Sequence, residues 1–490
     1  MTVINPNSIS GITSITLPSG DGNVLTIHTN DGTERFRIDS SGNVKVGSAA
    51  TISPDGDLFV TGVCTATTLS GAASGLTGAL PAIDGSALTG IAATDNVRTG
   101  ILDVAGVSTF RNTMNVGAAV TISESGIEAS GIGITCANIN GAQIGGRRNL
   151  VINGAMQVAQ RGTSETTASG YTTVDRFSQS ASNLANNCDV AQADVTSGDA
   201  YDSGFRKSYK VTNGDNNADS DDQSKINYKI EAQDLTNSGW SHKNPKSFIT
   251  LSFWVKSSVA QTFPISIYAE DANMAYGFEY SATTSWTKIT HTIPGHASLS
   301  INNDNGLGFN IQWYHYMGTD LTSSSFTNAD WHTYSSSSRS KDITTTWQTT
   351  NDATFEITGV QFEAGSQATP FEFRSFGDEL LLCQRYYQQI AGNTDNVCIG
   401  PGRSSGSATG IFSVPLSVPL RASPTVNSIA WAFFTADNQT NLTATPTVDK
   451  WDAVSPVLTC YVSGLSGMTN ARCLSAYSNS ANTFTISAEL

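Results

Sequence analysis

Alternating apolar and polar positions recur along much of this chain, and their period of two predicts β-strands. The pattern is clearest at residues 307–317. One side of that run is apolar or aromatic, and the other carries amides and tyrosines. The two sets are Phe309, Ile311, Trp313, His315 and Met317, and Asn310, Gln312, Tyr314 and Tyr316.

Several further runs between residues 147 and 375 have strand character, and polar loops separate them. The predicted strands are 207–212, 224–230, 248–255, 263–268, 288–293, 307–317 and 354–362. So many strands joined by polar loops favour an antiparallel, jelly-roll-like β-sandwich.

The first part of the chain, residues 1–146, differs in composition and in the length of its predicted strands. Short Val-, Ile- and Thr-rich strands alternate with turn signals such as Asp31-Gly32, and the phrase at 46–56 recurs imperfectly at 116–126. Although the chain holds 20 Phe, 14 Tyr and 8 Trp, residues 1–170 contain only Phe36, Phe59 and Phe110. Such a segment cannot close a thick core alone, so we expect identical chains to complete a fibrous stalk.

One segment, residues 378–390, lacks Gly and Pro and begins with two acids, which predicts a helix. An apolar seam follows at three-four-three spacing. Its members are Leu380, Cys383, Tyr387 and Ile390. The seam predicts either trimer contacts or packing of the helix on its own sandwich.

The last residues predict a second β domain, with strands at 414–420, 425–434, 456–462 and 483–490. We therefore expect a mostly β protein with four parts. They are an attachment region and stalk at 1–146, a β-sandwich at 147–375, a helical connector at 376–392 and a distal β-sandwich at 393–490.

Composition narrows the functional classes. The net charge of −15 and the pI of about 4.7 disfavour nucleic-acid binding, which needs clustered Lys and Arg. Seven scattered Cys without paired spacing predict neither a disulfide framework nor a metal site. Such cysteines also make assembly in a reducing cytosol the expectation. The N-terminus lacks signal-peptide character, and no apolar run is long enough for membrane insertion.

Several longer motifs resemble the tail-fibre proteins of tailed bacteriophages, especially marine, cyanophage-like ones. They are NLVINGAMQVAQRG at 149–162, GYTTVDRF at 170–177, the segment 357–387, VPLRASPT at 418–425 and the stalk phrase LPAIDGSALTGI at 80–91. The resemblance implies a homotrimeric virion fibre. Its N-terminal region would bind tail, baseplate or portal-associated proteins, and its distal end would face the host.

Within the motif at 357–387, most residues are expected to serve packing and turn geometry and not to contact a ligand. Gly359 and Gly365 allow tight turns, and Pro370 directs the chain outward. Glu363 and Arg374 are expected to pair and fix that exit.

Catalytic signatures are weak or missing: the sequence contains no HExxH, P-loop or dinucleotide fingerprint. No catalytic residue, cofactor or metal is therefore predicted. The acidic stretch 215–222 begins like a calcium loop but lacks the expected Gly and the closing Glu, so a solvated loop is favoured over a cation site.

Aromatic residues beside polar ones are the candidates for glycan contact, because sugars dock their apolar faces on exposed rings. The candidates are Tyr314, Tyr316, Trp331, His332, Tyr334, Trp431, Phe433 and Trp451. The alternative is that most of these rings fill sandwich cores.

Together these patterns predict a non-enzymatic, homotrimeric virion fibre that adheres to host surface polysaccharide or protein. Three weak sites on one rod would gain avidity. The alternatives are a capsule-degrading tailspike enzyme, and a head, collar or tail appendage with a mainly structural role.

Overall fold

The computed structural model describes residues 24–63 and 65, three strands between 114 and 129, residues 148–391 and, with short gaps, residues 397–490. The chain divides into two compact units, Met1–Arg111 and Asn112–Leu490. Each unit is considered by itself. The described residues are mostly strands in antiparallel sheets, which confirms the predicted fold class.

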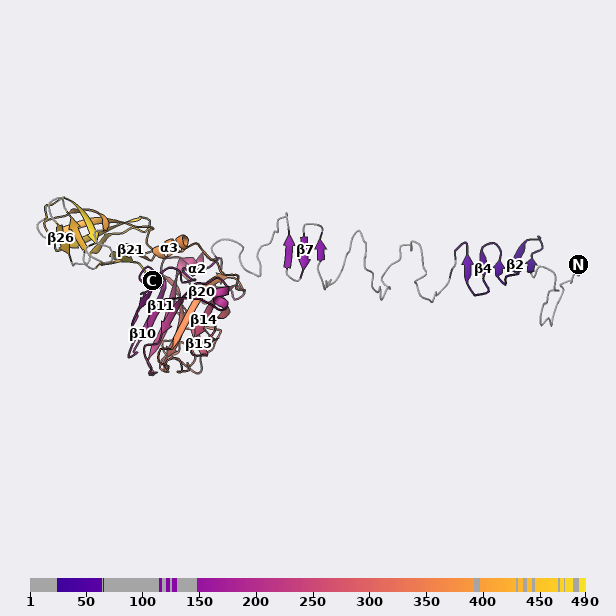
Figure 1. Ribbon diagram of the computed structural model, residues 1–490, viewed down its shortest axis with the longest axis horizontal. Coiled ribbons are helices and arrows are strands. Elements are labelled where there is room, and N and C mark those ends of the chain that lie inside the picture. The colour runs from indigo at the N-terminus through magenta and orange to yellow at the C-terminus, as the bar shows by residue number, and fades with distance from the viewer. Residues whose placement is uncertain are drawn as a thin grey trace. The chain divides into compact units, whose positions relative to one another are not determined.

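The first unit contains a five-stranded antiparallel meander in which each strand pairs with the next (Figure 1). Its strands are β1 (Leu25–His28), β2 (Glu34–Ile38), β3 (Val44–Val46), β4 (Ala50–Ile52) and β5 (Leu58–Val60). Gly32, Gly42, Gly47 and Gly56 adopt positive φ angles at the turns, as the turn signals predicted.

The internal repeat produces the same hairpin twice. In the first copy Val46 pairs with Ala50 across a tight turn, and in the second Val116 pairs with Val120. The second copy belongs to a three-stranded sheet. Its strands are β6 (Met114–Val116), β7 (Val120–Ser123) and β8 (Gly126–Ala129).

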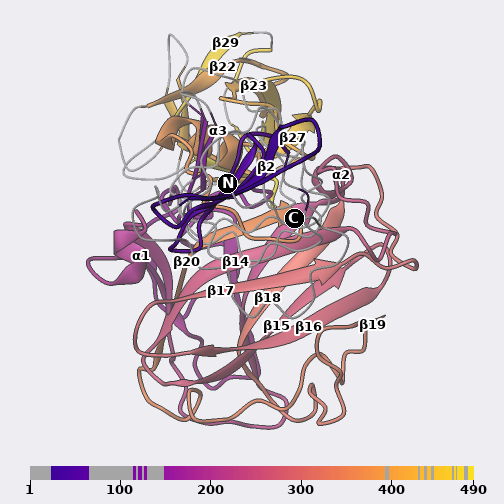
Figure 2. The same cartoon turned by 90° about the vertical axis from the view of Figure 1, so that its right-hand side faces the viewer.

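Residues 148–375 form an antiparallel sandwich of two six-stranded sheets (Figure 2). The first, here called the β18 sheet, contains β10 (Phe177–Ser182), β13 (Gln223–Glu231), β18 (Leu307–Met317), β15 (Gln261–Ala269), β16 (Met274–Ala282) and β19 (Trp331–Thr333). The second, the β20 sheet, contains β17 (Thr287–Pro294), β14 (Phe248–Ser257), β20 (Thr354–Ala364), β12 (Lys207–Thr212), β11 (Asp189–Asp194) and β9 (Ser164–Glu165). Two short helices, α1 (Asp199–Asp202) and α2 (Ala232–Thr236), lie in connections. All seven strands predicted in this region are present.

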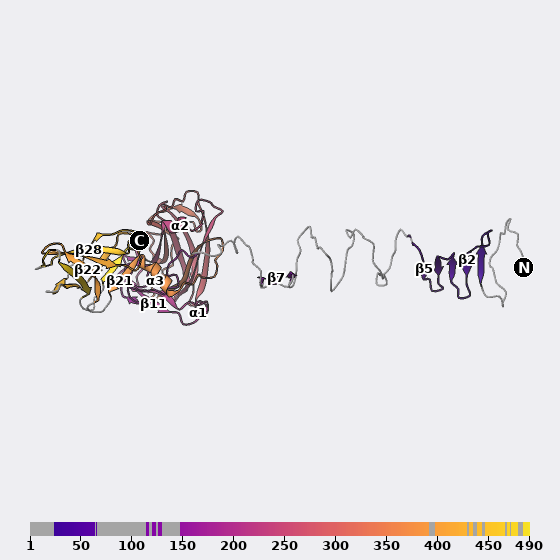
Figure 3. The same ribbon diagram turned by 90° about the horizontal axis from the view of Figure 1, so that it is seen from above.

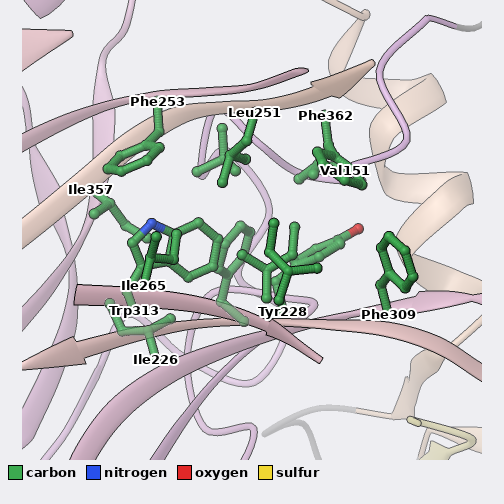
Figure 4. Packing of buried hydrophobic residues seen from close by; sticks show 14 of the residues in the cluster. Val151, Ile226, Tyr228, Leu251, Phe253, Ile265, Phe309, Trp313, Ile357 and Phe362 are labelled. Carbon is green, nitrogen blue, oxygen red and sulfur yellow. The ribbon is translucent and has the colours of Figure 1, made fainter. Parts of the chain in front are cut away.

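The sandwich core lies between the two sheets, where alternate residues of the long strands meet (Figure 4). Trp313 of β18 and Phe253 of β14 are fully buried, and their rings meet edge to face at 5.8 Å. At Gly359 of β20 the alternation shifts. An added Cβ there would lie 2.5 Å from the Phe205 ring, and φ is +61°, so the bulge requires glycine.

The connector helix is shorter than predicted. Helix α3 (Phe376–Gln384) begins with the Ser375 side chain accepting from the Asp378 amide, but it ends before β21 (Tyr387–Ala391). The prediction of a helix to residue 390 is wrong, because β21 pairs with β30 (Phe484–Ser487) and ladder bonds replace helical ones.

The C-terminal domain combines the three-stranded sheet β21–β30–β24 with a seven-stranded sheet (Figure 3). Its remaining strands are β22 (Cys398–Ser404), β23 (Thr409–Pro415), β24 (Thr425–Ser428), β25 (Trp431–Phe434), β26 (Gln439–Leu442), β27 (Thr447–Lys450), β28 (Val457–Ser463) and β29 (Cys473–Ser478). Two strand predictions fail here. The run 414–420 leaves the sheet at Pro415, since proline offers no amide to a ladder, and 425–434 is two strands in different sheets.

The end of the chain is fastened to the sandwich by charged groups. Glu489 forms ion pairs with Arg161, at 3.0 Å, and with the buried Arg176. Lys229 donates to the terminal Leu490 oxygen at 2.5 Å. These bonds join the last residues to β13 and to the first loop of the sandwich.

The expected Glu363–Arg374 pair is wrong. Arg374 instead pairs with Glu372 at 3.1 Å and Glu379 at 3.3 Å, and Glu363 accepts hydrogen bonds from Thr369. Glu372 and Glu379 lie closer to Arg374 along the chain, and the helix start brings Glu379 within reach.

A buried histidine makes the sandwich sensitive to acid. His315 is fully buried, stacks on Trp347, and burial lowers the pKa of its imidazole to about 3. The unfolded chain takes up this proton near pH 6.5, so His315 contributes stability fully above pH 6.5 and loses it as the pH falls toward 3.

We predict that His315→Gln flattens this dependence. Between pH 6 and pH 4 the wild-type free energy of unfolding should fall about 1.4 kcal/mol per pH unit more steeply than that of the variant. Denaturant unfolding at each pH measures the slopes, with the partly exposed His296→Gln as control. Equal slopes for wild type and His315→Gln would contradict the assignment.

Candidate functional site

The tyrosines predicted for glycan contact on β18 are buried. Tyr314 does lie on the side of β18 away from the core, but it is fully buried, its hydroxyl donates to Gln312, and the Lys225 ammonium lies 5.6 Å from its ring centre. Tyr316 is 3% exposed and donates to the Asp219 carbonyl. Both are therefore wrong as direct sugar contacts, because neighbouring side chains and loops cover them.

The other predicted rings have mixed outcomes. Trp331 is buried, and its indole donates to the Pro294 carbonyl at 2.8 Å, so it is wrong as a surface ring. His332 and Tyr334 are half-buried, with Tyr334 packed against Tyr268 at 4.6 Å. These two remain predictions. So does Trp451, which packs partly buried against the C-terminal core.

Two further predicted rings, Trp431 and Phe433, have no described side chains. Both lie on β25, whose backbone alone is described. Their side chains lie outside what the structure describes, and both residues remain predictions.

The seam of α3 packs on its own chain. Cys383 is fully buried in a cluster with Ile152, Val158 and Tyr386, against which Leu380 packs. Tyr387 is 6% exposed beneath the Arg161 guanidinium, and Ile390 packs against the C-terminal core. Cys383 and Tyr387 are therefore wrong as trimer contacts, whereas the partly buried Leu380 and Ile390 remain predictions.

An aromatic cavity of about 560 Å³ opens on the outer side of the β20 sheet, at β14 and β17. It combines rings, hydroxyls and one ammonium. Its lining is Ser203, Phe205, Trp254, Lys288, Ala368, Thr369, Pro370, Phe371 and Phe373.

The alternation of β14 explains why a tryptophan faces this cavity. Residues 249, 251, 253 and 255 fill the core, which leaves Trp254 pointing outward. Its partner across the ladder is the exposed Lys288 of β17. The sheet thus supplies a ring and a cation side by side.

Three phenylalanines form the opposite wall. Phe205 and Phe371 meet edge to face at 4.9 Å, and Phe371 meets Phe373 at the same distance. Phe373 stays 50% exposed, although Gly204 brings the backbone close to its ring. The wall is rigid on its inner side and open at Phe373.

A second, smaller cavity of about 320 Å³ lies one pleat further along the same strands. It is lined by Lys256 and Trp286 among other residues, and the Lys256 ammonium lies 5.0 Å from the Trp286 ring centre and 3.0 Å from Glu356. Lys256 follows Trp254 by two residues on one face, a separation of roughly 7 Å. The two cavities are thus neighbours on one surface.

This arrangement suits a polyhydroxylated ligand. Rings in a concave site offer flat apolar surfaces, while a few polar groups fix orientation. The hydroxyls of Ser203 and Thr369 and the Lys288 ammonium can exchange hydrogen bonds with sugar hydroxyls around those rings.

This cavity was not predicted from the sequence, although one signal pointed to it. In the strand sequence FITLSFWVKS the core-facing apolar positions are 249, 251, 253 and 255. Trp254 therefore occupies a position that faces the protein surface. A large ring at such a position is unusual on a sheet face that is otherwise polar. The Phe371–Phe373 wall gave no such signal, because its loop has no periodicity.

The acidic stretch 215–222 uses its carboxylates locally. Asp215 accepts from the Ala185 and Asn217 amides, and Asp222 accepts from the Asp219 amide. Within the described ranges, no group of three or more His, Cys, Asp or Glu is placed to hold a metal ion. No described helix has the length and apolar character needed to cross a membrane.

Comparisons by sequence find nothing: no family model and no curated protein matches the chain. Comparison of folds finds solved structures at low overall similarity. A CBM4 structure is 12% identical over 43% of this chain and 97% of its own length, with a TM-score of 0.23. A family 11 carbohydrate-binding module from Clostridium thermocellum, in complex with a mixed-linked tetrasaccharide, is 12% identical over 42% and 99%, with a TM-score of 0.21. The enzymatically active domain of bacteriophage CBA120 tailspike protein 4 is 10% identical over 44% and 21%, with a TM-score of 0.24.

Proposed function

We propose that this chain forms a homotrimeric, non-enzymatic virion fibre that adheres to glycan on a host cell surface. The N-terminal region would attach it to other virion proteins. The observation that carries the adhesive role is the aromatic cavity at Trp254 and Phe373. The fibre role and its phage setting come from the resemblance of the longer motifs.

Adhesion follows from the chemistry of the cavity. A sugar ring placed against Trp254 or Phe373 covers apolar surface that is otherwise partly exposed to water, which is favourable. Lys288 makes no ion pair with any described residue and is exposed beside Trp254. It is therefore free to bind a sugar oxygen.

The absence of catalysis is supported by the acids around the site. The larger cavity has no carboxylate in its lining, and the smaller one has Asp199 alone. Glycoside hydrolysis in most families uses two carboxylates across the sugar. Glu356 is engaged by Lys256 and Ser208.

Assembly into a homo-oligomer is supported by the meander of the first unit. Its pairing register puts apolar residues on one face of every strand. These are Leu25, Ile27, Phe36, Ile38, Val44, Val46, Ala50, Ile52, Leu58 and Val60.

Nothing in the described part of this unit covers that face. No residue among 24–63 is buried, and Ile27, Ile52 and Leu58 are 55%, 42% and 56% exposed. Burying a large aliphatic side chain contributes roughly 1.5–3 kcal/mol, so the same faces of neighbouring copies would stabilise one another. The number of copies, three, rests on the family resemblance.

The binding role predicts the effect of removing the rings. Trp254→Ala and Phe373→Ala should each weaken binding of host surface polysaccharide about tenfold, because a central ring of a binding site is lost. Affinity electrophoresis or calorimetry measures this. The matched control is Phe376→Ala, whose ring is 57% exposed but does not line the cavity. Full affinity in Trp254→Ala would rule the cavity out.

The assembly role predicts a contrast between two faces of one strand. Ile52→Asp places a charge on the apolar face of β4, whereas Thr51→Asp, its neighbour, places one on the other face. Light scattering and limited proteolysis should show that wild type and Thr51→Asp are trimers with a protected stalk. Ile52→Asp should lose protection at 24–63. A compact wild-type monomer would end this assignment.

The non-enzymatic role predicts that polysaccharide stays intact. Prolonged incubation of the protein with a host polysaccharide that it binds should leave the chain-length distribution unchanged, as size-exclusion chromatography would show. Shortened chains would instead identify a capsule-degrading tailspike.

A further inference from the structure

The outer side of the β18 sheet, opposite to the aromatic cavity, carries a second set of polar groups. The register aligns three strands there, so that Asn227, Gln312 and Ser266 form one row, and Lys229, Asn310 and Tyr268 form the next. Lys225 and Tyr314 pair in the row on the other side. We call these eight residues the polar face.

One cation on this face has no counter-charge. The Lys225 side chain makes no hydrogen bond or ion pair with any residue that the structure describes, and its ammonium lies 5.6 Å from the centre of the Tyr314 ring. Burial, together with the positive charges of Arg339 and Lys229, lowers the pKa of Lys225 to about 8. Holding such a charge without a partner costs free energy.

A second cation lies beside it. The Arg339 guanidinium donates from Nη1 to the Gln223 side chain at 2.8 Å, and Gln223 lies two residues before Lys225 on the same face of β13. Within the described ranges Arg339 forms no ion pair, and the other hydrogen bond of its guanidinium goes to the Ser336 carbonyl. Lys229 differs from both, because its ammonium donates a hydrogen bond to the Leu490 oxygen at 2.5 Å.

Neutral hydrogen-bonding groups adjoin the two cations. Gln312 donates to Asn227 at 3.3 Å, and the Asn310 side-chain oxygen is buried without a partner among the described residues. An unpaired buried acceptor is costly unless a ligand or water donates to it. Asn227, Asn310 and Gln312 are only 6%, 8% and 7% exposed, so the groups that this face offers to a ligand are the two cations.

We propose that Lys225 and Arg339 bind the carboxylate or sulfate group of an acidic polysaccharide. This second site lies on the opposite side of the sandwich from the aromatic cavity. Loss of binding at one site would therefore leave binding at the other site intact. Two cations in a chain of net charge −15 do not form the extended basic stripe that nucleic acid requires.

The test uses charge-matched ligands and a shape-preserving variant. Polygalacturonate, alginate, hyaluronate and carrageenan supply carboxylates or sulfates, and fully methyl-esterified galacturonan and dextran are the neutral controls. Lys225→Met keeps an unbranched stem over Tyr314 but removes the charge. Lys246→Met, at an exposed loop position, is the control variant.

We expect the full-length protein to bind at least one acidic polysaccharide in affinity electrophoresis, and more tightly than the neutral controls. Lys225→Met should weaken that binding about tenfold, whereas Lys246→Met and Trp254→Ala should not. Tighter binding of carrageenan would identify sulfate, and of the uronates carboxylate. Binding to none of the acidic polymers, or equal binding by Lys225→Met, would overturn the site, while loss only in Trp254→Ala would leave the aromatic cavity standing.

Discussion

The packing of two sheets face to face sets the phase of every long strand in the sandwich. Phe253 and Trp313 meet between the sheets, and their burial fixes which neighbours must point outward. Trp254 points outward for that reason, and Lys225 does so because Ile226 and Tyr228 of its own strand lie in the core. A slip of one residue in either strand would bury a charge or expose the core, so both candidate binding surfaces depend on this packing.

The meander of the first unit obeys the same alternation without a second layer. Its apolar face pairs Ile52 with Leu58 and Phe36 with Val46, yet no described residue of that unit is buried. The apolar face that forms a core in the sandwich is therefore left exposed by the described residues of this unit, and another copy of the chain can cover it. Identical chains supply an identical face, which is the simplest complement under symmetry.

Much of the fold could be predicted from the sequence, because alternation and turn residues act locally. The strand 307–317 was predicted to the residue, and the repeated phrase forms the same hairpin register in both copies. Which outward-facing side chains are covered by other parts of the chain could not be predicted in the same way. Tyr314 has the outward phase that alternation predicted, but a lysine from a neighbouring strand lies over it. The end of α3 depended on a strand a hundred residues away in the chain, β30.

The central proposal is an adhesive surface displayed by an oligomeric chain. A single density map can test the adhesion and the oligomeric state together. A cryo-electron microscopy reconstruction of the full-length protein with a bound host oligosaccharide would report copy number and ligand position together. We predict three copies joined through the apolar face of β1–β5, with a sugar ring against Trp254 and Phe373. A single copy, or sugar density that leaves both faces of the sandwich empty, would contradict the account.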